Sequence, residues 1–275
     1  MTESLTIAIG GAKAHYLETG AGHPVILLHP IPGDARTWRY NVDALSSRLR
    51  ALALDLPSWG RSESRKGFDH SLESQADYVA HFMKTLGLSQ ASLVGASLGG
   101  LVALEFSLKY PRLVDRLVIT GTEILGAKSI ERFLRPASFL QRQILRRGSA
   151  GAIRRLFEGC YADPEAVPKV LVHSYANHLA RAKAGEALAA THHALTARLA
   201  GLREDLAKIG VPTLVIRGAR DRFCSGDNAR FLTDGLPDAT LAELPNAGHH
   251  AQDESPAGFN NHVLPFLRDG ATASR

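Results

Sequence analysis

Residues 91–100 read ASLVGASLGG, a short apolar run that passes through a glycine-flanked serine. The run is predicted to be a buried strand, because it is short and apolar and ends at glycines. Leucines at helical spacing follow at Leu101, Leu104 and Leu108. The turn has the pattern G-x-S-x-G at Gly95, Ser97 and Gly99, where small flanking residues let a serine occupy a sharp bend. The stretch therefore predicts a strand, a tight turn carrying Ser97, and a helix.

The rest of the chain alternates between short apolar runs and helical patterns. The predicted strands are 5–9, 14–18, 25–29, 51–55, 91–96, 116–120, 211–218 and 239–244. Helices are predicted at 71–87 and at 252–267, and the tail 270–275 is predicted to be disordered. Such alternation predicts an α/β fold, with an eight-stranded, mostly parallel sheet flanked by helices.

Strand patterns are absent between Gly121 and residue 211, where the sequence is helical and rich in Ala, Arg and His. We expect a helical insertion at 124–205 between two parts of one core domain, 1–123 and 206–275. Residues 128–155 carry eight basic residues and one acidic residue, Glu131. We interpret them as solvated basic helix faces, with membrane-surface docking or attraction of an acidic substrate as alternatives.

Composition excludes several classes of protein. The chain has 275 residues, of which 45% are hydrophobic and 21% charged, as in ordinary globular proteins. No apolar run approaches the ~20 residues of a membrane-spanning helix, and the N-terminus lacks the features of a signal peptide, so a cytoplasmic location is expected. The net charge of +5 comes with no nucleic-acid-binding motif, so no nucleic-acid partner is expected.

Metal and cofactor sites are not expected either. Cys160 and Cys224 are too few for a disulfide framework, and no Cys/His spacing resembles a zinc site. His192 and His193 are sequence neighbours and so point to different parts of a helix surface. Cys224 is expected to be a small packing residue.

Partners for Ser97 lie late in the chain. A serine hydroxyl needs a base to take its proton, and that base is usually a histidine oriented by a carboxylate. Asp221 lies in a predicted loop after one strand, and His249 lies in the loop after the next. The order Ser97, Asp221, His249 is that of nucleophile, acid and base in one class of serine hydrolases.

At this point the sequence resembles the α/β-hydrolase superfamily, in its serine-nucleophile branch with a helical cap. The matching segments are HPIPG at 29–33, DLPSWGRS at 55–62, GASLGG at 95–100, GARD at 218–221 and GHHAQDE at 248–254. The resemblance implies the α/β-hydrolase fold, with a cap inserted after the sixth strand. It also implies that Ser97 is the nucleophile, Asp221 the acid, His249 the base and Glu254 a structural glutamate.

Two assignments leave an alternative open. His250 could be the base in place of its neighbour, although the Gly-His register of the family favours His249. Glu123 lies just past the strand at 116–120, where some family members carry the acid. Asp227 is interpreted as a helix-start residue.

The HPIPG segment predicts an oxyanion hole. Pro30 and Pro32 lack amide hydrogens, so Ile31 is the only backbone donor at positions 30–32. The resemblance implies that the N–H groups of Ile31 and Leu98 bind the oxyanion, and Asp34 is expected to cap the next helix. The alternative is a rigid turn that merely contains prolines.

Candidate pocket residues are aromatic or histidine side chains near these loops or in the insertion. They are His29, Trp38, Trp59, His173, Tyr175, His178 and His192. For each one the alternative is an ordinary packed or exposed side chain.

The expected activity is that of a serine hydrolase acting on a small to medium carboxylic ester or lactone through an acyl-enzyme. The alternatives are a C–C bond hydrolase, thioesterase or amidase on the same triad, and less readily a slow-turnover ligand-binding receptor, an acyltransferase or a lyase. Serine at the elbow argues against epoxide hydrolases and haloalkane dehalogenases of this fold, which use aspartate. No cofactor is expected, and the chain is expected to be a monomer or homodimer.

Overall fold

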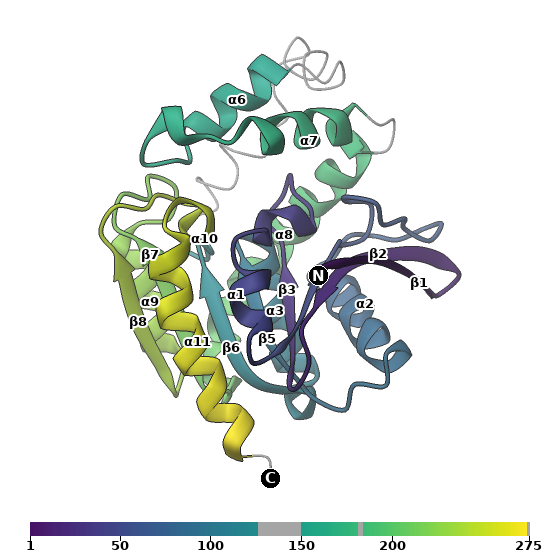
Figure 1. Cartoon of the computed structure of the whole chain (residues 1–275), viewed down its shortest axis with the longest axis vertical. Coiled ribbons are helices and arrows are strands. Elements are labelled where there is room, and N and C mark those ends of the chain that lie inside the picture. Colours follow the sequence, from purple (N-terminus) through teal and green to yellow (C-terminus); the bar gives the residue numbers. More distant parts are fainter. Residues whose placement is uncertain (126–149, 181–183, 274–275) are drawn as a thin grey trace.

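The computed structural model describes residues 1–125, 150–180 and 184–273, in which eight strands form one sheet (Figure 1). Their order is β1-β2-β4-β3-β5-β6-β7-β8, with antiparallel pairing of β1 with β2 and of β2 with β4, and parallel pairing elsewhere. The strands are β1 Glu3–Ile9, β2 Ala12–Thr19, β3 Pro24–Leu28, β4 Arg50–Leu54, β5 Ala91–Ala96, β6 Val114–Thr120, β7 Thr213–Gly218 and β8 Ala239–Leu244. The predicted eight-stranded, mostly parallel sheet is confirmed.

Both faces of the central parallel strands are buried, as parallel sheets require. In β3, Ile26 and Leu28 belong to one hydrophobic cluster, and Val25 and Leu27 belong to another. All four side chains are fully buried, because alternate residues of a strand point to opposite faces. This explains why the central strands are continuously apolar in the sequence.

Helices cover both faces (Figure 1). On one side lie α2 (Leu72–Thr85), α3 (Leu98–Lys109) and α9 (Gly226–Gly235), and on the other lie α1 (Val42–Ser46) and α11 (Pro256–Ala273). Short 3-10 helices are η1 Ala35–Trp38, η2 Pro111–Leu113 and η4 Leu206–Lys208. The predicted helix at 71–87 is confirmed as α2, and the side chain of Ser71 caps it by accepting from the amide of Ser74.

The C-terminal region differs from the prediction in two ways. Instead of one helix at 252–267, α10 (Ala251–Glu254) ends before Ser255, and α11 begins at Pro256. Proline suits the first position of a helix, because its missing amide hydrogen would have no partner there. Positions 270–273, predicted to be disordered, continue α11, so the disorder prediction is wrong for them; 274–275 lie outside the described residues.

Between β6 and β7 the described residues form helices, as predicted for the insertion. They are α6 Ala150–Glu158, η3 Pro164–Ala166, α7 Lys169–Leu179 and α8 Ala184–Asp205. Helices α6 and α7 lie at the top of Figure 1, beyond the end of the molecule that holds α10, and α8 leads back to the core. The domain boundaries at 124 and 205 stay a prediction. Basic residues 128–147 lie outside the described part of the chain, whereas Arg154 pairs with Glu158 and Glu165.

Among the described helices, none combines the length and the hydrophobicity needed to cross a bilayer.

Candidate active site

Ser97 occupies the turn between β5 and α3 in a backbone conformation that side chains rarely adopt, with φ of 53° and ψ of −116°. Its amide donates to the carbonyl of Thr120 at the end of β6, at 2.9 Å. A Cβ at Gly95 would lie 2.4 Å from the carbonyl oxygen of Gly99, and one at Gly99 would lie 2.1 Å from that of Leu28. The turn therefore requires glycine at both motif positions.

His249 follows β8 and approaches the same turn at the end of β6. A Cβ on Gly121 would lie 3.2 Å from Cε1 of the His249 ring. The neighbouring Thr122 donates its hydroxyl hydrogen to the carbonyl of Ser97, at 3.3 Å. The turn at residues 120–122 thus contacts both Ser97 and His249, which brings the predicted nucleophile and base to the same edge of the sheet.

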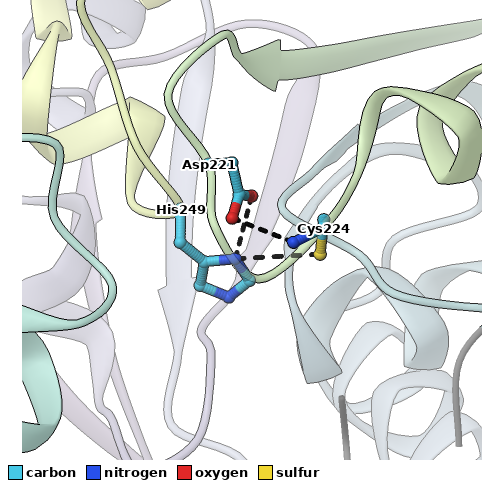
Figure 2. A group of neighbouring side chains, drawn as sticks. All are labelled: Asp221, Cys224 and His249. Carbon is cyan, nitrogen blue, oxygen red and sulfur yellow. Dashed lines mark hydrogen bonds and ion pairs between the residues drawn. The ribbon is translucent and has the colours of Figure 1, made fainter. Parts of the chain in front are cut away.

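Asp221, in the loop after β7, pairs with the imidazole of His249 (Figure 2). Its Oδ2 lies 3.0 Å from Nδ1 of His249, and its Oδ1 accepts the amides of Phe223 at 2.7 Å and Cys224 at 2.9 Å. Burial raises the pKa of the Asp221 carboxyl, but the charge and hydrogen bond of His249 and the two amides outweigh it, so the pKa is lowered. Asp221 is therefore an ionised carboxylate at neutral pH.

The two alternatives from the sequence have different surroundings. Glu123 is buried and accepts the amide of Leu125 at 2.9 Å, whereas the carboxylate bonded to Nδ1 of His249 is that of Asp221. His250 packs against the rings of Phe157 and Tyr161, and burial lowers its pKa to about 3. The geometry thus favours Asp221 and His249 over Glu123 and His250.

Cys224 lies beside this pair, which the sequence did not predict. Its Sγ is 3.8 Å from Nδ1 of His249 (Figure 2), and the side chain is buried. Burial raises the pKa of the Cys224 thiol well above its ordinary value, so the thiol is protonated at neutral pH. Its burial is in keeping with the interpretation as a packing residue, and the contact with His249 is the part that the sequence did not indicate.

Hydrogen bonds of two buried side chains, His29 and Asp55, hold the predicted oxyanion loop in place. The Nε2 of His29 accepts the amide of Leu56 at 3.0 Å, its Nδ1 donates to the carbonyl of Pro30 at 2.8 Å, and burial lowers the pKa of the ring. Asp55 accepts the amide of Ala35 at 2.7 Å. His29, predicted to line a pocket, is thus a neutral side chain that shapes this loop.

The two predicted oxyanion donors, the amides of Ile31 and Leu98, lie in segments close to the turn that carries Ser97. Leu98 is the first residue of α3, where amides have no acceptor within the helix. Ile31 is buried in the loop whose start, at Leu28 and His29, runs against Gly99. Their role in oxyanion binding stays a prediction. Asp34 caps η1 by accepting the amide of Arg36, as expected.

The other predicted pocket residues differ in their burial and in their contacts. Trp38 packs against Phe259 in the cluster beneath α11, and His173 is exposed and donates to the carbonyl of Lys169 on its own helix. Neither position supports a pocket role, because Trp38 is packed inside the core and His173 lies on the outer face of its helix. Trp59 stacks on His178 with ring centroids 4.8 Å apart. Tyr175 is buried, with its hydroxyl 2.9 Å from that of Thr37, and His192 is half-buried on α8.

The segment after α6 is tied to the histidine loop. The amide of His249 donates to the carbonyl of Cys160 at 2.8 Å, and Tyr161 donates to the carboxylate of Asp253. Glu254 accepts three amides, those of Ala162 at 2.6 Å, Gly248 at 3.0 Å and His250 at 3.1 Å. The predicted structural glutamate therefore joins the insertion to the loop that carries His249.

Comparisons with known proteins agree with this fold. Residues 23–256 match the family model described as the alpha/beta hydrolase fold. The chain is 30% identical over 262 residues to a 2-hydroxy-6-oxononadienedioate/2-hydroxy-6-oxononatrienedioate hydrolase of Burkholderia vietnamiensis, covering 93% of this chain and 91% of that protein. It is 28% identical over 279 residues to a 2-hydroxy-6-oxo-6-(2'-aminophenyl)hexa-2,4-dienoic acid hydrolase of Metapseudomonas resinovorans, covering 97% and 91%.

Among solved structures, the epoxide hydrolase CorEH superposes with a TM-score of 0.87 at 20% identity, covering 98% of this chain and 99% of that chain. At this identity the likeness concerns the fold alone.

Proposed function

This chain belongs to the α/β-hydrolase family, and we propose that it is a serine hydrolase cleaving a carbon–carbon bond next to a ketone in a 2-hydroxy-6-oxo-dienoate. The observation that carries the proposal is the full-length similarity to hydrolases named for such substrates. The similarity supports a hydrolase in general, and among the activities expected from the sequence it supports the C–C bond hydrolase in particular. The expected carboxylic ester or lactone substrate has no such support.

The proposed mechanism uses the residues gathered around the β6 turn. His249 takes the hydroxyl proton of Ser97 as Oγ attacks the ketone carbon at position six. The oxyanion accepts hydrogen bonds from the amides of Ile31 and Leu98. Asp221 stabilises the imidazolium, because its carboxylate is ionised and bonded to Nδ1.

Collapse of the tetrahedral intermediate breaks the bond between carbons five and six. For the electron pair of this bond to be conjugated, the dienol is first ketonised: the proton of the 2-hydroxyl moves to carbon five, which leaves a ketone at carbon two and a double bond between carbons three and four. The electron pair of the broken bond then passes through that double bond to the oxygen of carbon two, so the leaving group is a stabilised dienolate and not a bare carbanion. The imidazolium of His249 supplies the proton that this leaving group needs. Water activated by His249 then hydrolyses the acyl group from Ser97, and the enzyme returns to its starting state.

The charge of the protein is consistent with this substrate class. Dienoates and dienedioates are carboxylates, and the chain carries a net charge of +5. A positive protein raises the local concentration of anionic ligands and their rate of association. An uncharged ester would gain nothing from this field.

The test compares kcat/KM for a 2-hydroxy-6-oxo-dienoate, followed by loss of its dienol absorbance, with values for p-nitrophenyl esters, a lactone and a thioester. We expect the dienoate to be preferred by at least about 100-fold, the fold-change of roughly 3 kcal/mol in transition-state binding. Ser97→Ala and His249→Ala should both abolish its cleavage. Equal or better turnover of the esters would instead establish the ester hydrolase.

A further inference from the structure

Three different ligand atoms converge at the base of the site. We propose that Asp221, Cys224 and His249 capture a thiophilic divalent cation such as Zn²⁺ or Cd²⁺, and that the captured ion inhibits the hydrolase. The three side chains offer one oxygen, one sulfur and one nitrogen, all within 4.8 Å of one another (Figure 2). Borderline and soft cations favour such mixed sulfur and nitrogen donors over oxygen alone.

The spacing of the donors is close to that around a tetrahedral zinc ion. Bonds of about 2.0 Å to nitrogen and oxygen and about 2.3 Å to sulfur place neighbouring ligand atoms about 3.3 Å (N and O) and 3.5 Å (N and S) apart. Here Nδ1 of His249 lies 3.0 Å from Oδ2 of Asp221 and 3.8 Å from Sγ of Cys224. These two pairs therefore need shifts of only a few tenths of an ångström, whereas the oxygen and the sulfur, which lie within 4.8 Å, have to close toward about 3.5 Å as the ion binds. A water completes the fourth position.

Backbone hydrogen bonds hold the donors together before any ion arrives. Oδ1 of Asp221 accepts the amides of Phe223 and Cys224, so the carboxylate and the thiol belong to one tight turn. Because Oδ1 is engaged, Oδ2 is the oxygen directed at His249 and the ion. A site of this kind pays little to become ordered on binding.

A crevice next to α9 has Gly121, Asp221, Cys224 and Asn228 among its lining residues, so two of the three donors border it. The side chains themselves are buried, with 7% of Asp221, 3% of Cys224 and 7% of His249 exposed. A carboxylate and a thiolate neutralise a divalent ion, which removes most of the cost of burying its charge.

Binding forms one bond from the metal to each of oxygen, nitrogen and sulfur. The Cys224 thiol proton and the Nδ1 proton of His249 leave, and Nε2 takes up one proton, so one proton is released to solvent and nothing is oxidised or reduced. Nε2, the nitrogen left for Ser97, then already holds a proton and cannot accept another from the hydroxyl. The inhibition rests on the proposed role of His249 as base, whereas the metal binding does not.

The experiment titrates Cd²⁺ into metal-free wild type, Cys224→Ser, Cys224→Ala and Cys160→Ser, the last being the matched control on the other buried cysteine. Each sample is followed by the ultraviolet charge-transfer band of the sulfur–cadmium bond and by the rate of dienoate or ester cleavage, relative to its own metal-free rate. Circular dichroism checks that each variant is folded. Wild type and Cys160→Ser should develop the band at one equivalent and lose activity in parallel, and both Cys224 variants should lack the band.

The two readouts separate the proposals. A band that persists without Cys224, or a wild type that gives none in excess cadmium, would overturn the metal site. A Cys224-dependent band with no loss of rate would keep the site but overturn the inhibition and contradict His249 as the base. If the protein cleaves none of the substrates, the absorbance titration alone decides the metal site.

Discussion

His249 experiences two opposing effects on its pKa. Burial lowers the pKa of the imidazole, but the charge and hydrogen bond of Asp221 raise it by a larger amount, so the net shift of the pKa is upward. The folded protein therefore stabilises the imidazolium, the form that exists after the base has taken a proton from serine. The kcat/KM of the hydrolase should fall as the pH drops through this raised pKa, because the free enzyme needs a neutral base.

Asp221→Asn should lower kcat by about 10³- to 10⁴-fold with little loss of stability. The amides of Phe223 and Cys224 keep the remaining side-chain oxygen in the place of Oδ1, so the new NH₂ group faces His249. It donates to Nδ1, which forces the ring proton onto Nε2 and blocks proton transfer from Ser97. Steady-state kinetics measure the effect.

Glu123→Gln is the matched control, since Glu123 is the alternative acid from the sequence. It should retain most of the wild-type rate. A larger loss of kcat in Glu123→Gln than in Asp221→Asn would reverse the assignment of the acid.

At the scale of secondary-structure elements, the insertion contacts two core loops separately, one carrying His249 and the other carrying Asp34. The segment after α6 is bonded to the loop before α10, through Cys160, Tyr161 and Ala162. Helix α7 contacts the oxyanion side, where Ser174 donates to Asp34 at 2.7 Å and Tyr175 meets Thr37. Both core loops are therefore hydrogen-bonded to the insertion, each through a different part of it.

Glu254→Gln should reduce the free energy of unfolding by about 1–3 kcal/mol and also lower kcat. Glutamine places an NH₂ group where a carboxylate oxygen now accepts backbone amides of Ala162, Gly248 or His250, so a buried donor loses its acceptor. Denaturant unfolding and kinetics measure the two effects. Glu243→Gln is the control, because Glu243 is half-exposed and its pair with Arg217 should contribute under about 1 kcal/mol.

Asp34→Asn should lower the free energy of unfolding at neutral pH by roughly 1–2 kcal/mol. Burial raises the pKa of Asp34, but bonds from Arg36 and Ser174 lower it from 3.8 to about 2. Because the folded pKa is the lower one, this stabilisation is present above about pH 4 and is lost as the pH falls toward 2.

The difference between wild type and Asp34→Asn should therefore shrink in acid, as measured by urea unfolding at several pH values. A constant difference would show that the charge of Asp34 is not what stabilises the contact. Ser174→Ala, which removes the bond to Asp34 and the bond that Ser174 accepts from Arg36, should cost about 1 kcal/mol.

At the scale of the whole molecule, net charge and substrate charge make a joint prediction. The kcat/KM for a doubly negative dienedioate should fall roughly threefold or more as salt rises toward ~0.3 M, because screening removes steering by the positive protein. The value for a neutral p-nitrophenyl ester should stay nearly constant. Equal salt dependence for both substrates would mean that the field of the protein plays no part in their capture.

Much of the architecture was predictable because it depends on local patterns. The eight strands lie where short apolar runs predicted them. Ser97, Asp221 and His249 each follow a parallel strand, so all three residues lie at the carboxyl ends of the strands. What escaped prediction depends on contacts between distant segments. The approach of Cys224 to His249 depends on the turn in which Asp221 accepts the amide of Cys224, and the bond of Glu254 to the amide of Ala162 joins residues 92 positions apart.

The positions of the catalytic candidates along the chain also determine at which stage of translation the complete set is present. Ser97 and its strained turn emerge early, whereas Asp221, His249 and the anchoring Glu254 follow strands β7 and β8. A ribosome-bound chain that has reached only β7 holds a serine without a base. Nascent or truncated polypeptides of that length should therefore be chemically inert, and hydrolase activity should arise abruptly, as the last two strands join the sheet.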